Sequence, residues 1–401
     1  MSNNRCVCRT RPFTTSTFAL PAIVILALTL GATRTVSAKQ DADKPKPTTV
    51  DCNAGQSINK ALSQAKPGGT ILVAGTCHER VVITKPVTLD GGASATIDGA
   101  GVAQVVQAPA ASPEFDGLVV IDGVSGVHLI GLTIQNAANN GIVAAHGAAI
   151  VLGNITTQNN ALTGILVIDN STAEAIDCVT RSNRLGFDVV TNSSLVLKGA
   201  FASTNNATNG GDINGESIVE LRGAQVTLND NQQFGVIAGS SSHVAIFGWD
   251  AANGSTLTAS GNLVAGLGFA DSRLTTFSDT VITLTNNGIG LLLAPNGHVS
   301  SPPFSGATFV MHGNDVGMNL RMGATAFMIG KLDVHGNDIG VLADEASVFL
   351  QALPASQGSI TGNGTNVQLL FGSRSTILNV AIGTPLVCDA TVLSRGTATC
   401  P

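Results

Sequence analysis

Residues 159–167 read NNALTGILV, an asparagine-containing turn followed by a glycine and an apolar run. The same order of asparagine, glycine and apolar residues returns at intervals of 22 to 31 residues along most of the chain. The repeated glycines are Gly141, Gly164, Gly186, Gly210, Gly235, Gly266, Gly290, Gly317, Gly340 and Gly364. Repetition with a period of about 24 residues is typical of a solenoid, in which each repeat forms one coil.

Asparagines precede these glycines by a few residues and mark turns, because both residue types tolerate left-handed backbone angles. They are Asn159, Asn183, Asn205, Asn231, Asn262, Asn287, Asn314 and Asn337. Between the turns lie short segments rich in Val, Ile, Leu, Thr and Ala, with alternation such as residues 164–167 and 195–197. The pattern predicts three short strands in each coil.

One coil cannot bury its inward side chains alone, but coils stacked at a strand spacing of ~4.8 Å share one continuous apolar core. We therefore predict an all-β fold, a right-handed, single-stranded parallel β-helix over residues 70–387 with about ten or more coils. Residues 50–69 are expected to form an N-terminal cap and residues 388–401 a C-terminal cap.

A short helix is predicted within the N-terminal cap, at residues 56–66. Its apolar side chains fall on one face at helical spacing, and Pro67 ends the segment. These side chains are Ile58, Ala61, Leu62 and Ala65.

The first 38 residues have the layout of a secretory signal peptide, with early arginines, an apolar run at 18–32 and small residues before Ala38. The run is shorter than a membrane-spanning helix requires, and Pro21 interrupts it. We expect cleavage after Ala38 and a secreted, periplasmic or cell-surface protein without a membrane span. Residues 39–49 are expected to be a disordered linker.

Without residues 1–38 the chain has 16 basic and 26 acidic side chains, a net charge of −10, which disfavours nucleic acid as a partner. Cys52 with Cys77, and Cys388 with Cys400, lie near the two ends of the predicted solenoid and are expected to form disulfides in an oxidising compartment. Cys178 lies inside a strand-like run and is interpreted as a small buried hydrophobe.

The segment from Ile58 to Gly91 contains AKPGGTI at residues 65–71, then Gly75, Glu79 and apolar runs at 81–83 and 87–89. This segment resembles the first coil of the pectin-lyase-like superfamily, as found in pectin methylesterases and NosD-like periplasmic proteins. The resemblance implies the β-helix fold. The superfamily's catalytic signatures, such as QDT, DFIFG, RxPxxR, DPHD and the polygalacturonase elements, are absent from this sequence, so no catalytic residue is carried over.

Residues two positions after each repeated glycine are predicted to point outward and to stack on adjacent coils. This column is Val143, Leu166, Asp188, Asp212, Ile237, Gly268, Leu292, Asn319 and Leu342. Asp188 and Asp212 thus meet on neighbouring coils, where like charges raise a pKa unless a cation lies near. The pair is a candidate catalytic pair of a retaining glycosidase or a Ca²⁺ site, and the alternative is two solvated surface residues.

Four further side chains are candidate substrate-binding residues around this pair. They are Arg184, Asp169, Glu216 and His146. Ca²⁺ is the one candidate cofactor, and no metal site is assigned. His312 and His335 share a turn position and Lys198 and Arg222 share a strand position, and both sets are interpreted as structural.

The rest of the outward column is apolar, and we call Val143, Leu166, Ile237, Leu292 and Leu342 the apolar stripe. Such a stripe indicates either a surface for a glycan or protein partner, or a face covered by residues 251–261 or the terminal segments.

Two functions remain open from the sequence. The first is a non-catalytic exported scaffold that binds a partner, with a glycan as the candidate ligand. The alternative is a polysaccharide-active enzyme, a glycoside hydrolase, lyase or esterase that uses Asp188 and Asp212. The absence of tyrosine and the single tryptophan leave few aromatic platforms for sugar rings.

Overall fold

The computed structural model describes residues 46–102, 116–248, 254–277, 279–302, 306–353, 358–396 and 400. The expected signal peptide and residues 39–45 of the expected linker lie outside the described residues. The described residues all belong to one compact unit.

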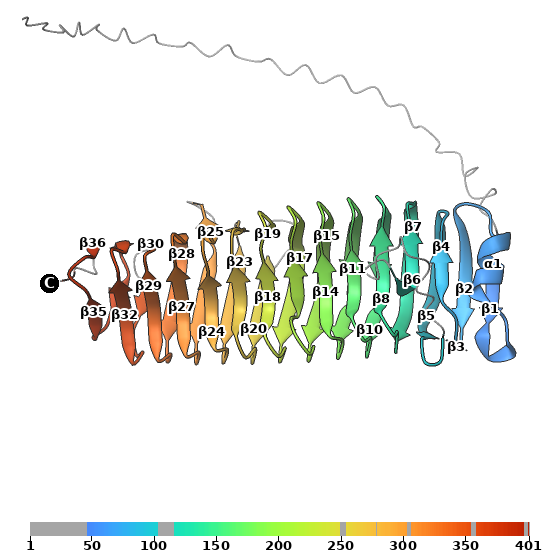
Figure 1. The fold of residues 1–401 in the computed structure, drawn as a ribbon, viewed down its shortest axis with the longest axis horizontal. Coiled ribbons are helices and arrows are strands. Elements are labelled where there is room, and N and C mark those ends of the chain that lie inside the picture. The colour runs from blue at the N-terminus through green and yellow to red at the C-terminus, as the bar shows by residue number, and fades with distance from the viewer. Residues whose placement is uncertain are drawn as a thin grey trace, which may run out of the picture. The chain divides into compact units, whose positions relative to one another are not determined.

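Thirteen strands form one parallel sheet, called sheet B, with one strand from each coil. Every strand pairs with its equivalent in the next coil, and Figure 1 shows the coils following one another in sequence order. The strands are β4 (Val81–Ile83), β6 (Gly117–Asp122), β8 (Asn140–Ala145), β11 (Thr163–Val167), β14 (Leu185–Val189), β16 (Gly211–Ile213), β18 (Phe234–Ala238), β21 (Ala265–Phe269), β24 (Ile289–Leu293), β27 (Val316–Arg321), β29 (Ile339–Asp344), β32 (Thr365–Leu370) and β35 (Leu386–Cys388).

The other 23 strands form a second parallel sheet, called sheet A. They are β1 (Thr48–Asp51), β2 (Gly69–Ala74), β3 (Thr76–Cys77), β5 (Val87–Asp98), β7 (Ser125–Gln135), β9 (Ala149–Gly153), β10 (Thr156–Gln158), β12 (Thr172–Ile176), β13 (Val179–Arg181), β15 (Ser194–Thr204), β17 (Ile218–Asn229), β19 (His243–Phe247), β20 (Ser255–Ser260), β22 (Arg273–Thr276), β23 (Thr280–Thr285), β25 (His298–Ser301), β26 (Thr308–His312), β28 (Thr325–His335), β30 (Ser347–Ala352), β31 (Gly358–Ile360), β33 (Arg374–Leu378), β34 (Ala381–Ile382) and β36 (Leu393–Gly396).

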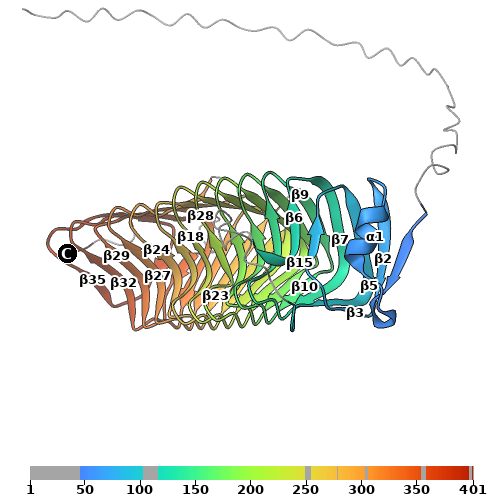
Figure 2. The same ribbon diagram turned by 45° about the vertical axis from the view of Figure 1, so that its right-hand side comes forward.

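Each complete coil contributes two strand segments to sheet A, which bends around a corner of the solenoid (Figure 2). In one coil these segments are β12 and β13, and in the next they are joined as β15. The first part of β15 pairs with β12 and its last part pairs with β13. The predicted right-handed parallel β-helix with three strand segments per coil is therefore confirmed.

The core is a column of apolar side chains inside the coils. Alternating residues of each strand face inward, and Phe187 and Val189 of β14 are both buried in this core, as are Phe201 and Phe269 from other coils. Asp188, between Phe187 and Val189, consequently faces outward.

The repeated asparagines have a different role from the predicted one. Asn183, Asn231 and their equivalents do not have left-handed backbone angles, and the residue before each of them does, as at Ser182 and Asp230. The asparagine side chains are buried and form a ladder in which Nδ2 of one asparagine donates to Oδ1 of the next, for example Asn231 to Asn262 at 3.0 Å. The ladder positions are Asn160, Asn183, Asn206, Asn231, Asn262, Asn287, Asn314, Asn337 and Asn363. The predicted left-handed angle is present at Asn159 and Asn205, each of which lies one residue before a ladder position.

The repeated glycines allow close approach between coils. A Cβ atom at Gly186 would collide with the carbonyl oxygen of Gly210 in the next coil. In the last repeat the prediction was wrong, because Val341 pairs with Val367 and Asn366 therefore takes the place expected for Gly364.

A second, serine ladder crosses another corner of the solenoid and was not predicted. The hydroxyl oxygens of Ser193, Ser217 and Ser242 accept hydrogen bonds from the backbone N–H groups of Ser171, Ser193 and Ser217, respectively. Both ladders satisfy backbone donors that burial at the corners would otherwise leave unpaired.

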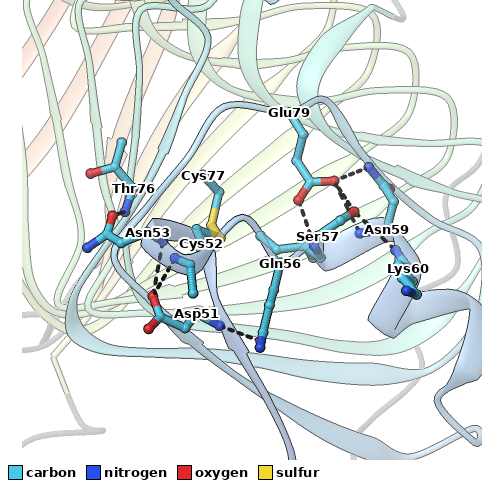
Figure 3. The surroundings of a disulfide bond; sticks show 12 residues. Asp51, Cys52, Asn53, Gln56, Ser57, Asn59, Lys60, Thr76, Cys77 and Glu79 are labelled. Atoms are coloured by element: carbon cyan, nitrogen blue, oxygen red, sulfur yellow. Dashed lines mark hydrogen bonds between the residues drawn. A yellow bond between two sulfur atoms is a disulfide. The ribbon is translucent and has the colours of Figure 1, made fainter.

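The N-terminal cap contains η1 (Cys52–Ala54) and α1 (Ile58–Gln64), with Ile58, Ala61 and Leu62 buried as predicted. Figure 3 shows Glu79 next to the first turn of α1, where its carboxylate accepts hydrogen bonds from Ser57 Oγ at 2.8 Å and from the Ile58 backbone N–H at 2.6 Å. β1 starts at Thr48 and pairs with β2, so the first strand begins two residues inside the range expected for the linker.

The two expected disulfides are present. Cys52 bonds to Cys77 (Figure 3), and Cys388 bonds to Cys400. Cys178 is buried, and burial raises the pKa of its thiol to about 11, which keeps it protonated and unreactive near neutral pH. Among the described residues, no helix has the length and apolar character needed to cross a bilayer.

Candidate functional site

The predicted carboxylate pair lies in register on adjacent strands of sheet B. Asp188 of β14 pairs with Asp212 of β16, and both side chains point away from the core. The whole outward column follows the predicted register, from Val143 and Leu166 through the two acids to Leu342.

A pocket of about 640 Å³ lies over this part of sheet B and contains both carboxylates. Its lining combines aliphatic side chains with amides and hydroxyls. The lining residues are Asn140, Leu162, Thr163, Leu166, Ile168, Arg184, Leu185, Asp188, Val190, Thr191, Thr208, Asn209, Asp212 and Gln233. Both predicted carboxylates therefore line one pocket over the middle coils, which is the candidate site.

Asp212 is partly buried, and desolvation by burial raises the pKa of its carboxyl group above the usual value. Its neutral partners are Asn214, whose Nδ2 donates a short hydrogen bond, and Asn209, whose Nδ2 lies 3.4 Å from Oδ2. These amides oppose the shift without cancelling it. The Oδ1 atom of Asp188 is shielded from solvent as well.

Arg184 is the one cation among the pocket-lining residues, and it is exposed at the rim. It lies four residues before Asp188, and its carbonyl oxygen accepts hydrogen bonds from the backbone N–H and the Oγ1 of Thr208. Within the described part of the chain, Arg184 forms no ion pair with an acidic side chain. Its guanidinium is therefore available to an anionic or hydroxyl group of a ligand.

The other three predicted binding residues do not line the pocket. His146 and Asp169 lie at left-handed turn positions after sheet B, where His146 Nδ1 is 2.6 Å from Asp122 Oδ1 and Nε2 is 3.9 Å from Asp169 Oδ2. Glu216 is exposed in the equivalent turn, two coils after Asp169. Thr191, from the turn between them, is the part of this corner that reaches the pocket.

The apolar stripe divides into two parts. Val143 and Leu166 are buried together with Val120, Ala145 and Ile168 in an apolar cluster separate from the core. Farther along, Ile237, Leu292 and Leu342 are partly exposed. Residues 255–260 form β20 in sheet A, so this part of the 251–261 segment does not cover sheet B, and residues 251–253 lie outside the described residues.

The stacked histidines and the two basic residues of the shared strand position contact neighbouring side chains of the solenoid. The rings of His312 and His335 stack with centroids 5.2 Å apart. Lys198 forms an ion pair with Glu174 at 2.9 Å, and Arg222 forms one with Glu220 at 2.7 Å. In the described ranges, no three His, Cys, Asp or Glu side chains are placed to hold a metal ion.

One row of polar residues on sheet A was not predicted from the sequence. His243, Arg273 and His298 are in register on β19, β22 and β25. Burial, together with the charge of Arg273, lowers the pKa of His243 to about 4 and also lowers the pKa of His298. The row is hard to see in the sequence because it lies eight, seven and eight residues after the repeated glycines, and the intervening turn differs in length.

No family profile matches this chain, and no curated protein sequence matches it either. Among solved structures, the chain is similar to an alginate lyase from Paenibacillus sp., with 16% identity over 82% of this chain and 98% of that one and a TM-score of 0.37. It is also similar to a family 28 exopolygalacturonase of Yersinia enterocolitica, with 11% identity over 88% and 78% of the two chains and a TM-score of 0.42. A mutant of the periplasmic alginate epimerase AlgG has 11% identity over 87% and 82% and a TM-score of 0.47. The parallel β-helix is defined by the strand pairing itself, and likeness at this level assigns no activity.

Proposed function

We propose that this protein is an exported, non-catalytic glycan-binding protein whose ligand lies in the pocket around Asp188 and Asp212. The observation that carries the proposal is the mixed lining of this pocket, in which carboxylates and amides lie next to aliphatic side chains. Sugar hydroxyl groups need hydrogen-bond partners, while the C–H faces of a sugar ring pack on apolar side chains. The expected signal peptide and the two disulfides support export.

The pocket offers both kinds of contact at once. Asp188, Asp212 and Asn209 supply acceptors and a donor on one side, and Leu166, Ile168 and Val190 supply an apolar wall. Leu166, Asp188 and Asp212 lie on strands of sheet B, and Ile168, Val190 and Asn209 lie within two residues of a strand end, so a ligand would have little to order.

The test is binding of a panel of neutral, acidic and amino-containing oligosaccharides to the full chain purified after export. Asp188→Asn and Asp212→Asn are each expected to weaken binding about 10-fold or more, because hydrogen bonds to charged groups contribute about 1.5–3 kcal/mol. Asp333→Asn is a matched control, since Asp333 is an exposed carboxylate on β28 that contacts His335. Binding that is unchanged in both pocket variants would refute the proposal.

A second candidate function is glycoside hydrolysis, and the raised pKa of Asp212 favours it. A hydrolase needs one carboxyl group that stays protonated and a second that is ionised. Asp212 would be the acid and Asp188 the nucleophile or base. Release of new reducing ends that stops in both Asp→Asn variants would support this reaction, whereas binding without product formation would leave the binding function alone.

A further inference from the structure

We propose that the pocket selects a glycan that carries a free amino group, with the ammonium of an amino sugar lying between Asp188 and Asp212. This inference rests on the glycan-binding function proposed above and specifies its ligand. Three features of the site carry it, namely the charges in the pocket, the charges around it and the apolar part of its lining.

The charges inside the pocket are unbalanced toward negative. Two carboxylates lie on adjacent strands, at a strand spacing of ~4.8 Å, and Arg184 at the exposed rim is the one cation that lines the pocket. The partners of Asp212 are the amides of Asn209 and Asn214, which bring no positive charge. A ligand that places a cation near Asp212 would therefore replace the hydration that burial removes.

The surroundings have the same sign. Asp169 and Glu216 lie on the turns of the coils on either side of Thr191, and Asp122, at the end of β6, lies against His146 farther along the same corner. The chain without its first 38 residues has a net charge of −10. This field attracts cationic ligands and repels polyuronates.

The lining distinguishes an organic ammonium from a metal ion. Ca²⁺ takes about six to eight oxygen ligands, and the described residues provide no group of three acidic or histidine side chains at one point. An ammonium has three N–H donors, so two carboxylates and one further oxygen satisfy it. Leu166, Ile168 and Val190 would then contact the sugar ring that carries the amine.

The experiment compares three oligosaccharides of equal length and the same β-1,4 linkage, made of glucosamine, of N-acetylglucosamine and of glucose. Binding to the full chain is measured by titration calorimetry below the pKa of the amine, at low and high salt. The glucosamine oligomer is expected to bind about tenfold more tightly than the other two, because its hydrogen bonds to the carboxylates are charge-assisted. Added salt should weaken its binding most.

Variants sharpen the result. Asp212→Asn keeps the shape of the side chain and is expected to abolish the preference for the amine. Arg184→Gln removes a like charge from the rim and is expected to tighten binding of the glucosamine oligomer about threefold, while Asp333→Asn leaves it unchanged. Thermal unfolding checks that each variant is folded.

Tighter or equal binding of the acetylated or glucose oligomer, lost in the pocket variants, would overturn the amino-sugar inference and leave the glycan-binding function standing. An Arg184→Gln variant that weakens binding of the glucosamine oligomer would also overturn the inference. Absence of binding by any glycan of the wider panel would overturn the proposed function itself.

Discussion

The outer face of sheet B differs between its middle coils and its C-terminal coils, although the backbone register is the same in both. Asp188 of β14 and Asp212 of β16 occupy the column position that Leu292 of β24 and Leu342 of β29 occupy farther along. Coils therefore stack with either an acid or leucine at this position. Burial raises the pKa of Asp212, so the ionised carboxylate is disfavoured at this position. An ionised acid therefore lowers stability at a position where other coils have leucine. Residues that lower stability in this way are expected at ligand-binding sites.

The largest effect on stability is expected from substitutions in the asparagine ladder, which runs through both regions. Asn231 accepts two hydrogen bonds from Asn206 and donates to Asn262 and to the Ser203 carbonyl oxygen, and Asn337 has equivalent contacts in a C-terminal coil. Asn231→Ala and Asn337→Ala should each lower the free energy of unfolding by about 3 kcal/mol, because buried donors and acceptors lose their partners.

Urea denaturation measures this loss, and Gln232→Ala is the control, since Gln232 is exposed beside the ladder. Similar losses at the two sites would show that the middle and C-terminal coils differ only on their outer face. A loss confined to Asn231 would instead mean that the interior differs as well.

Making the middle coils resemble the C-terminal ones is expected to have a smaller effect of opposite sign. The double substitution Asp188→Leu and Asp212→Leu should raise the free energy of unfolding at pH 7 by about 1 kcal/mol and abolish ligand binding. The folded state holds a proton on Asp212 more tightly than the unfolded state does, so the ionised carboxylate opposes folding above the unfolded pKa of about 4.

Thermal unfolding of the wild type and the double variant at pH 7 and near pH 4 measures this gain, which should shrink at the lower pH. A double variant that is less stable than the wild type at pH 7 would mean that the acids are part of the structural framework.

The smallest effect on stability is expected at the histidines of sheet A. Their contribution to stability changes with pH in the opposite direction from that of the acids of sheet B. Burial and the charge of Arg273 lower the pKa of His243 to about 4, below the unfolded value of about 6.5. The unfolded state then binds more protons in this range, so stability is retained above pH 6.5 and falls as the pH decreases toward 4.

Arg273→Gln should raise the pKa of His243 and of His298 and reduce this loss, by about 1 kcal/mol at most because solvent screens partly exposed groups. NMR titration of the histidine ring protons measures the two pKa values directly. Unchanged pKa values in this variant would leave burial as the sole cause of the shifts.

The acid pair could be predicted from the sequence because its position in the outward column is counted from the repeated glycine of each coil. The count holds over short distances within sheet B, where Gly186 and Gly210 align and Asp188 and Asp212 follow two residues later. It does not extend to the turns that follow these strands, so His146, Asp169 and Glu216, predicted as substrate-binding residues, do not line the pocket. The lengths of these turns also vary, so the count from the glycines does not bring His243, Arg273 and His298 into one row.

The sequence by itself determined the β-helix, the register of sheet B from Gly141 to Gly340, the capping helix and the two disulfides. These follow from repeats and spacings along the chain, because a stacked coil requires the same residue type at the same place in each turn. Only the tertiary structure decided that the asparagines form a buried ladder, that Asp188 and Asp212 share a pocket with Arg184, and that Asp212 is desolvated. Burial and convergence depend on side chains from several coils at once, and no single repeat contains that information.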